Sequence, residues 1–120
     1  MTHGPDPMGT LLHNQRPLTA WRIRMAKSWW RRAVGLLTTS KLDEPSGLWI
    51  SPCSSVHTIG MRYAIDVVFL DEMGRVKKLV RCLKPFRCAV CWGACSTLEL
   101  RAGAIDELFF RLGDLIRLKM

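Results

Sequence analysis

Polar side chains of the kinds that bind ligands gather just ahead of the most apolar run of the chain, Ile65 to Leu70. Hydroxyl, imidazole, guanidinium and carboxylate groups can orient a ligand together when a rigid strand supports the loop that carries them. This grouping predicts a polar ligand-binding site centred on His57. Its candidate residues are Ser54, Ser55, His57, Met61, Arg62 and Asp66.

The same stretch also contains a metal-binding pattern. Cys53, His57 and Met61 are separated by three residues each, and thiolate, imidazole and thioether are copper ligands. In an extended chain, residues four apart lie more than about ten Å from each other, so one ion could bind all three only across a tight turn. We therefore favour a hydrogen-bonded histidine beside a core methionine.

The remaining four cysteines, Cys82, Cys88, Cys91 and Cys95, lie close together in the sequence. Thiolates at these spacings can bind zinc or an iron–sulfur cluster, with Cys88, Cys91 and Cys95 as candidate ligands, and Cys88 with Cys91 could instead form a redox disulfide. Structural zinc sites normally bring their ligands as two pairs, and free cysteines are common in reduced proteins. We expect no metal and no cofactor.

Catalytic arrangements have less support. Ser54 and Ser55 beside His57 suggest a nucleophile and a base, but no elbow motif and no third member accompany them. Acid–base catalysis by Asp66 needs a second carboxyl group in the same cleft, and nothing in the sequence places one there. A role in solvated turns is favoured for Asp66 and Asp71. An enzyme is thus the third hypothesis, and we expect a non-catalytic protein.

The chain is strongly basic, with 18 Lys and Arg against 10 Asp and Glu in 120 residues, a formal net charge of +8. Such a surface attracts nucleic acid, anionic lipid or acidic proteins. Trp29-Trp30-Arg31-Arg32 and Trp21-Arg22 also interleave aromatic and cationic residues as such binders do. Core tryptophans beside solvated arginines explain the same pattern. A polyanion- or partner-binding module is therefore the alternative function, and nucleic acid is not the favoured partner.

No apolar run approaches the length of a membrane span, and the first residues lack the basic and apolar regions of a secretory signal. The odd number of cysteines, five, gives no indication of export. These features predict a cytoplasmic protein without a transmembrane segment.

Hydrophobic periodicity predicts the elements that position the candidate site. Residues 1–17 are expected to form a flexible arm, and residues 18–120 a single domain. Alternation predicts a hairpin turning at Asp71–Gly74 behind the site, and a strand at 96–100 whose Glu99 faces solvent. Further strands are expected at 18–25, 47–50 and 115–118, and helices at 29–37 and 104–111. The fold class is mainly β (α+β), a compact barrel or sandwich of about six to eight short strands with one or two short helices.

Several ordered motifs indicate a family. They are RAVGLL from Arg32, HTIGM from His57 running into IDVVFLD from Ile65, GRV from Gly74, LELRAG from Leu98 and LGD from Leu112. With them the chain resembles the domain of unknown function 192 family, small bacterial and archaeal proteins, over about residues 18–118. The resemblance implies a mainly-β sandwich or barrel with short helices, and it implies no activity. The chain departs from the family pattern in Arg101, where proline is usual, in its cysteine cluster, and in lacking the export leader of many members.

Overall fold

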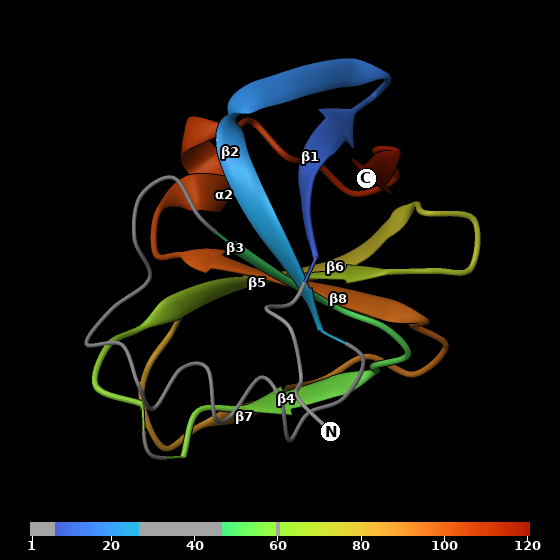
Figure 1. Ribbon diagram of the computed structural model, residues 1–120. Coiled ribbons are helices and arrows are strands. Elements are labelled where there is room, and N and C mark those ends of the chain that lie inside the picture. Colours follow the sequence, from blue (N-terminus) through green and yellow to red (C-terminus); the bar gives the residue numbers. More distant parts are fainter. Residues whose placement is uncertain (1–6, 27–46, 60) are drawn as a thin grey trace, which may run out of the picture.

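The computed structural model describes residues 7–26, 47–59 and 61–120, which form two β-sheets (Figure 1). The described part of the chain contains nine strands and one short helix. Their bounds, in chain order, are β1 Met8–His13, β2 Arg16–Ala26, β3 Gly47–Ile50, β4 Ser55–His57, β5 Ile65–Leu70, β6 Val76–Leu83, β7 Cys88–Val90, β8 Ser96–Arg101, α2 Ala104–Glu107 and β9 Ile116–Lys119.

The larger sheet has seven strands in the order β6-β5-β8-β3-β2-β1-β9, and β4 pairs with β7 in a separate two-stranded sheet. Only the β2–β3 pairing in the large sheet is parallel. The two edges of the large sheet approach each other at one corner, where Arg75 and Leu115 form an isolated bridge. The sheet is not closed into a barrel. The prediction of a mainly-β fold is confirmed, in its sandwich-like form.

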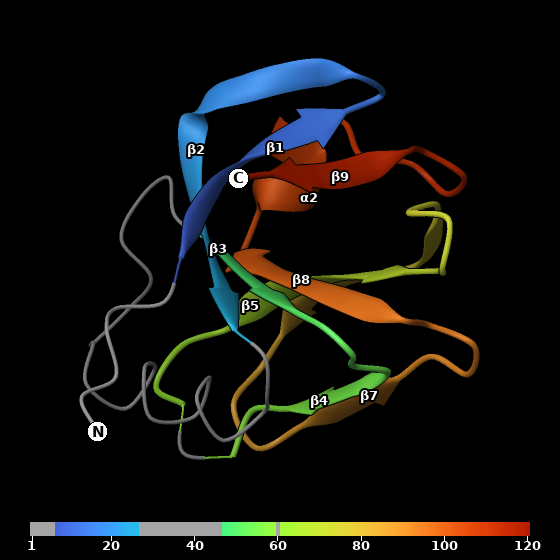
Figure 2. The same cartoon turned by 45° about the vertical axis from the view of Figure 1, so that its right-hand side comes forward.

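Each face of the large sheet covers its own hydrophobic cluster. The curved interior holds the first cluster, which includes Leu11, Trp21, Leu100 and Ile116. The opposite face packs through Val67 and other residues against the inner side of the β4–β7 sheet. Figure 2 shows the small sheet as a separate layer below the large one, far from the β1–β2 hairpin. The small sheet therefore presents its other side outward.

The central hairpin forms as predicted, because its strands and its turn are both specified locally. All six residues of β5 are buried, and β6 pairs with it in antiparallel register. Asp71 Oδ1 accepts the backbone N–H groups of Met73 at 2.8 Å and Arg75 at 2.9 Å. Gly74 supplies the positive φ of 85° that the turn requires.

The predicted flexible arm is wrong over its second half. Residues 8–13 form β1, which lies between β2 and β9 in the large sheet. Leu11 is fully buried in the first cluster, and Asn14 and Gln15 take positive φ values of 50° and 70° in the hairpin turn. Residues 1–6 and the predicted helix at 29–37 lie outside the described residues.

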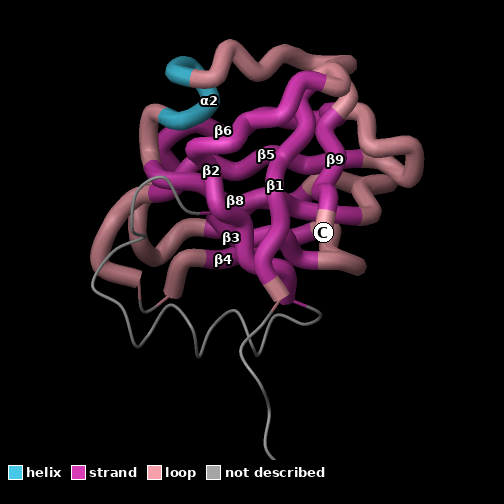
Figure 3. The backbone as a smooth tube through the Cα atoms, turned by 45° about the horizontal axis from the view of Figure 1, so that its top comes forward, coloured by secondary structure: helices cyan, strands magenta, loops and turns pink. Residues whose placement is uncertain are grey.

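Three smaller expectations also differ from the structure. The helix expected at 104–111 ends at Glu107, so α2 is a short helical segment among the strands (Figure 3). Phe109 takes a φ of 58° and is exposed, whereas Phe110 is buried in the core. The connection after residue 87 contains β7. Glu99 is buried, because β8 lies between β3 and β5 and both of its faces are covered. In the described part of the chain, no helix has the length and apolarity to cross a membrane.

Candidate functional site

His57 lies at the end of β4, on the outward side of the two-stranded sheet. Its cross-strand neighbour is Cys88, and Ser55 pairs with Val90. Because side chains alternate along a strand, these four share one face. The residue between them on β4, Val56, points the other way into the second hydrophobic cluster. Ser55, Cys88 and Val90 are exposed and His57 is half-buried, so this outer face is accessible to a ligand.

Thr58, immediately after β4, fixes the loop that enters β7. Its buried hydroxyl donates to the carbonyl oxygen of Lys84 at 2.6 Å and accepts the N–H of Arg87 at 2.9 Å. The Thr58 backbone also binds the carbonyl oxygen of Arg87 and the N–H of Phe86. One buried side chain therefore holds the loop 84–87 at the end of the small sheet, where β7 begins.

Asp66 belongs to a different part of the molecule. Its register partner, Leu100, lies in the first hydrophobic cluster, so its carboxylate is on the interior face of the large sheet. Oδ1 accepts the N–H of Cys82 at 2.9 Å. Oδ2 accepts the N–H groups of Gly103 at 3.1 Å and Ile105 at 2.9 Å. The interpretation of Asp66 as a solvated-turn residue is wrong, because the side chain is 1% exposed and ties the start of α2 to β6.

The other candidates take separate positions around the small sheet. Met61 is buried in the second hydrophobic cluster, and Arg62 is exposed. The carbonyl oxygen of Ser54 accepts the N–H of Cys91 at 2.9 Å, which fixes the start of β4. The structure therefore brings Ser54, Ser55 and His57 together on the small sheet and places Asp66 on the far side of the large one.

The five cysteines are free thiols in different environments. Cys91 is buried in the second cluster, while Cys82, Cys88 and Cys95 are exposed. Cys53 is half-buried and donates its S–H to the carbonyl oxygen of Ser55 at 3.0 Å. Within the three described ranges, no three His, Cys, Asp or Glu side chains are placed to hold a metal ion.

Four cations lie near the small sheet. Residues 73–98 contain no Asp or Glu, and Lys77, Lys78, Lys84 and Arg87 lie near β7, whereas Arg75 binds Gly113 at the corner between β6 and β9. Arg81 pairs with Asp106 at 2.9 Å. Lys78 instead reaches across to β7, where its Nζ donates to the carbonyl oxygen of Val90 at 2.9 Å. The Lys78 ammonium group is thus fixed at the edge of the face that carries His57.

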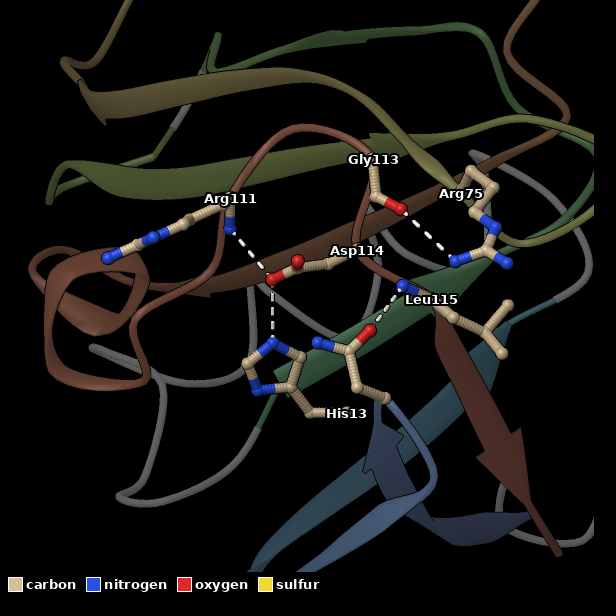
Figure 4. A network of polar contacts seen from close by, with 7 residues as sticks. His13, Arg75, Arg111, Gly113, Asp114 and Leu115 are labelled. Atoms are coloured by element: carbon tan, nitrogen blue, oxygen red, sulfur yellow. Dashed lines mark hydrogen bonds and ion pairs between the residues drawn. The ribbon is translucent and has the colours of Figure 1, made fainter.

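Sequence reasoning missed a partly buried polar network where the edges of the large sheet meet (Figure 4). His13 Nε2 lies 2.7 Å from Asp114 Oδ2, and the imidazole ring packs edge-on against Phe110. The same carboxylate accepts the N–H of Arg111 at 2.9 Å. Burial raises the pKa of Asp114, but hydrogen bonds from His13, Arg111 and Asn14 and the charge of His13 together hold this pKa below its ordinary value.

Two neighbouring bonds complete this corner. Asn14 Oδ1 accepts the N–H of Leu115 at 2.9 Å, and Arg75 donates to the carbonyl oxygen of Gly113 at 3.3 Å (Figure 4). The network joins the ends of β1, β6 and β9, so we assign it a structural role. In the sequence, Asn14 could have indicated a hairpin turn at this corner, because asparagine favours positive φ and lies here between two apolar runs.

Two open hollows lie elsewhere on the surface. One, of about 660 Å³, follows the β1–β2 hairpin and includes Arg22 and Lys119. The other, of about 490 Å³, lies between the turn at 71–74 and β9, with Trp49 in its lining. Neither contains any of the six candidate residues, so both are separate from the His57 face.

Comparison with known proteins gives a family and a fold. The model of the domain of unknown function 192 family (DUF192), described as an "Uncharacterized ACR", matches residues 10–118. No curated protein matches the chain.

Two solved structures share the fold. One, from Sinorhizobium meliloti 1021, is described as a "putative transcription regulator"; it has 14% identity and a TM-score of 0.81, and the match covers 98% of both chains. A protein of unknown function from Novosphingobium aromaticivorans DSM 12444 has 17% identity and a TM-score of 0.76, over 92% of this chain and 84% of that one. Identities this low establish similarity of fold alone.

Proposed function

The chain belongs to the domain of unknown function 192 family, and we propose that it is a non-catalytic module that binds an anionic ligand on the outer face of the β4–β7 sheet, around His57. The observation that carries the proposal is the hydrogen bond that holds the Lys78 ammonium group on Val90 at the edge of this face, with Lys77 and Arg87 nearby and no Asp or Glu in residues 73–98. A ligand that touches His57 meets Lys78 at one edge of the small sheet and the loop of Lys84 and Arg87 at its end.

The layer that carries the face supports binding without large rearrangement. Val56 and Ala89 anchor the small sheet in the second hydrophobic cluster, and Thr58 holds the loop 84–87. Polar groups on such a supported layer are positioned before the ligand arrives, which lowers the entropy lost on binding.

The site differs from the one expected from the sequence in a way that favours binding over catalysis. Asp66, the only carboxylate among the six candidates, is engaged with three backbone N–H groups inside the fold. The remaining polar and basic groups can neutralise and orient an anion. The basic surface expected from the sequence is a different place, because Arg22 lines the hollow at the β1–β2 hairpin and residues 29–32 lie outside the described residues. A related fold is described as a "putative transcription regulator", and a polyanionic ligand is compatible with such a role here.

A titration with tripolyphosphate, followed by amide chemical shifts in NMR spectra, tests the proposal. We expect shifts at His57, Cys88 and Val90, and we expect Lys78→Gln to weaken binding several-fold. Arg16→Gln is the matched control, because it removes an exposed cation from the β1–β2 hairpin at the other end of the molecule (Figure 1). Equal weakening by both variants, or shifts confined to the β1–β2 hairpin, would show that the net charge rather than this face attracts the probe.

A further inference from the structure

Two aromatic side chains stand out into solvent at the two ends of β7. Trp92 is 84% exposed and Phe86 is 68% exposed. Six residue steps separate them, so they lie at most about 20 Å apart. Large aromatic rings that stay this exposed on one layer of the described residues indicate a binding surface.

Both rings are mounted on fixed backbone. The N–H of Phe86 is bound by the carbonyl oxygen of Thr58 at 3.2 Å, and Phe86 takes a φ of 61°, which a bulky residue seldom adopts. Trp92 lies in the turn closed by the hydrogen bond from Ala94 N to the carbonyl oxygen of Cys91, and Cys91 N is itself bound to Ser54. The surrounding structure therefore fixes the backbone from which each ring projects.

Cations flank each ring. Lys77 Nζ lies within 3.1 Å of the place a Cβ atom on Gly93 would occupy, next to Trp92, and Lys78 is bound to Val90 two residues before it. Lys84 and Arg87 lie on either side of the Phe86 turn. Aromatic rings that alternate with cations along a track match a polymer in which flat bases alternate with phosphates.

Resting on the proposed function, we infer that the anionic ligand is single-stranded nucleic acid, lying along β7 with bases stacked on Trp92 and Phe86 and phosphates near the lysines and Arg87. A duplex keeps its bases inside the stack, so exposed rings would have no partner there.

A lipid surface fits this face less well than a single strand. An interfacial membrane binder presents a continuous apolar face to the acyl chains. Here the two rings are separated by Ser55, His57 and Cys88, which can form hydrogen bonds with bases but would be desolvated in a bilayer. Val90, which is 40% exposed, and Ile59 add apolar surface, but Val90 lies beside Ser55 and Ile59 lies at the Phe86 end, so the polar residues interrupt the apolar face.

The test measures the anisotropy of a fluorescein-labelled deoxythymidine oligomer of about ten nucleotides, a length within the range of known single-strand sites. Trp92→Leu should weaken binding roughly 5- to 100-fold, the loss of one base–aromatic stack, whereas Trp92→Phe should retain most of the affinity. Lys78→Gln should reduce the slope of log Kobs against log salt by about 0.7. Phe109→Leu is the matched control, because Phe109 is an equally exposed ring beyond α2.

Each contrary result has a distinct meaning. If Trp92→Leu binds the oligomer as tightly as the unaltered protein, the nucleic-acid inference fails, and the anionic-ligand proposal still stands provided that Lys78→Gln weakens tripolyphosphate binding. If phosphatidylserine vesicles bind in a Trp92-dependent way and the oligomer does not, the face is a membrane contact and the inference is overturned. If neither the oligomer nor tripolyphosphate binds, both proposals fail together.

Discussion

Replacing Asp66 by alanine should destabilise the fold strongly, because the carboxylate is the acceptor for three backbone N–H groups. One of them, on Ile105, is buried, and the loss of its partner costs the full desolvation penalty of about 1–3 kcal/mol. The N–H groups of Cys82 and Gly103 are part-buried and can recover some hydration, so we assign about 1 kcal/mol to each. The sum is about 3–5 kcal/mol, a large share of a total stability that is typically about 5–15 kcal/mol.

The asparagine variant separates geometry from charge. An asparagine oxygen placed at the Oδ2 position keeps the bonds from Gly103 and Ile105, but its amide nitrogen then faces the N–H of Cys82. Two donors would oppose each other there, and the charge-assisted strength of the remaining bonds is lost. We expect Asp66→Asn to cost about 2–3 kcal/mol, less than Asp66→Ala.

Urea unfolding followed by tryptophan fluorescence measures these differences. Asp71→Ala is the matched control, since Asp71 also accepts two backbone N–H groups, but in an exposed turn where water can replace it. The free energy of unfolding of that variant should fall by only about 1 kcal/mol. The reasoning is refuted if Asp66→Ala costs no more than Asp71→Ala. A variant that stays fully stable yet loses tripolyphosphate binding would instead place Asp66 in the ligand site.

Three further predictions concern the support of the two layers. Thr58→Val, which preserves shape but removes the hydroxyl that binds Arg87, should cost about 1–3 kcal/mol in the same urea assay, and an unchanged midpoint would contradict it. Gly47→Ala should lower the free energy of unfolding by about 1–3 kcal/mol, because the new Cβ would lie 2.6 Å from a Leu100 methyl carbon. An unchanged stability would contradict this prediction and mean that β3 and β8 can move apart to accept the methyl group. The pKa of Asp114 is lower in the folded protein than in the unfolded chain. The stability that its carboxylate contributes is therefore fully present at pH values above the unfolded pKa, and it is lost as the pH falls through the folded pKa. The stability difference between the unaltered protein and Asp114→Asn should therefore be constant at neutral pH and shrink below about pH 4, and a difference that persists at pH 2 would refute this assignment.

The hairpin at the centre of the fold was predictable because the residues that form its strands and its turn are neighbours in the sequence. The apolar run at 65–70 and the Asp71–Gly74 turn lie within ten residues of each other, and both act on backbone geometry directly. The last strand and β8 followed from alternation in the same way. β1 was not predictable by this route: its apolar residues are few, and its partner β9 lies about a hundred residues away.

The candidate site was half predictable for a related reason. Proximity in sequence suggested that Asp66 joins His57, but a strand turns successive side chains to opposite faces. Ile65 and Val67 face the small sheet, so Asp66 must face away from it. The bonds that define its role reach residues 37 and 39 positions further along the chain. The role of Thr58 was not predictable for the same reason, because the carbonyl and N–H groups that it binds belong to a loop almost thirty residues further along the chain.

A two-stranded sheet is marginally stable in water when it stands alone. The β4–β7 pair persists because Val56 and Ala89 pack on the large sheet, and because Thr97 Oγ1 donates to the carbonyl oxygen of Cys53 and ties the approach to β4 to β8. The inner side of the small sheet thus attaches it to the large sheet, while Ser55, Cys88 and Val90 on its outer side are exposed. Exposed rings and cations on that outer side cost stability without contributing to the core. The exposed Trp92 and Phe86 rings next to Lys78, on a layer outside the first hydrophobic cluster, are the strongest reason to propose that layer as the binding surface.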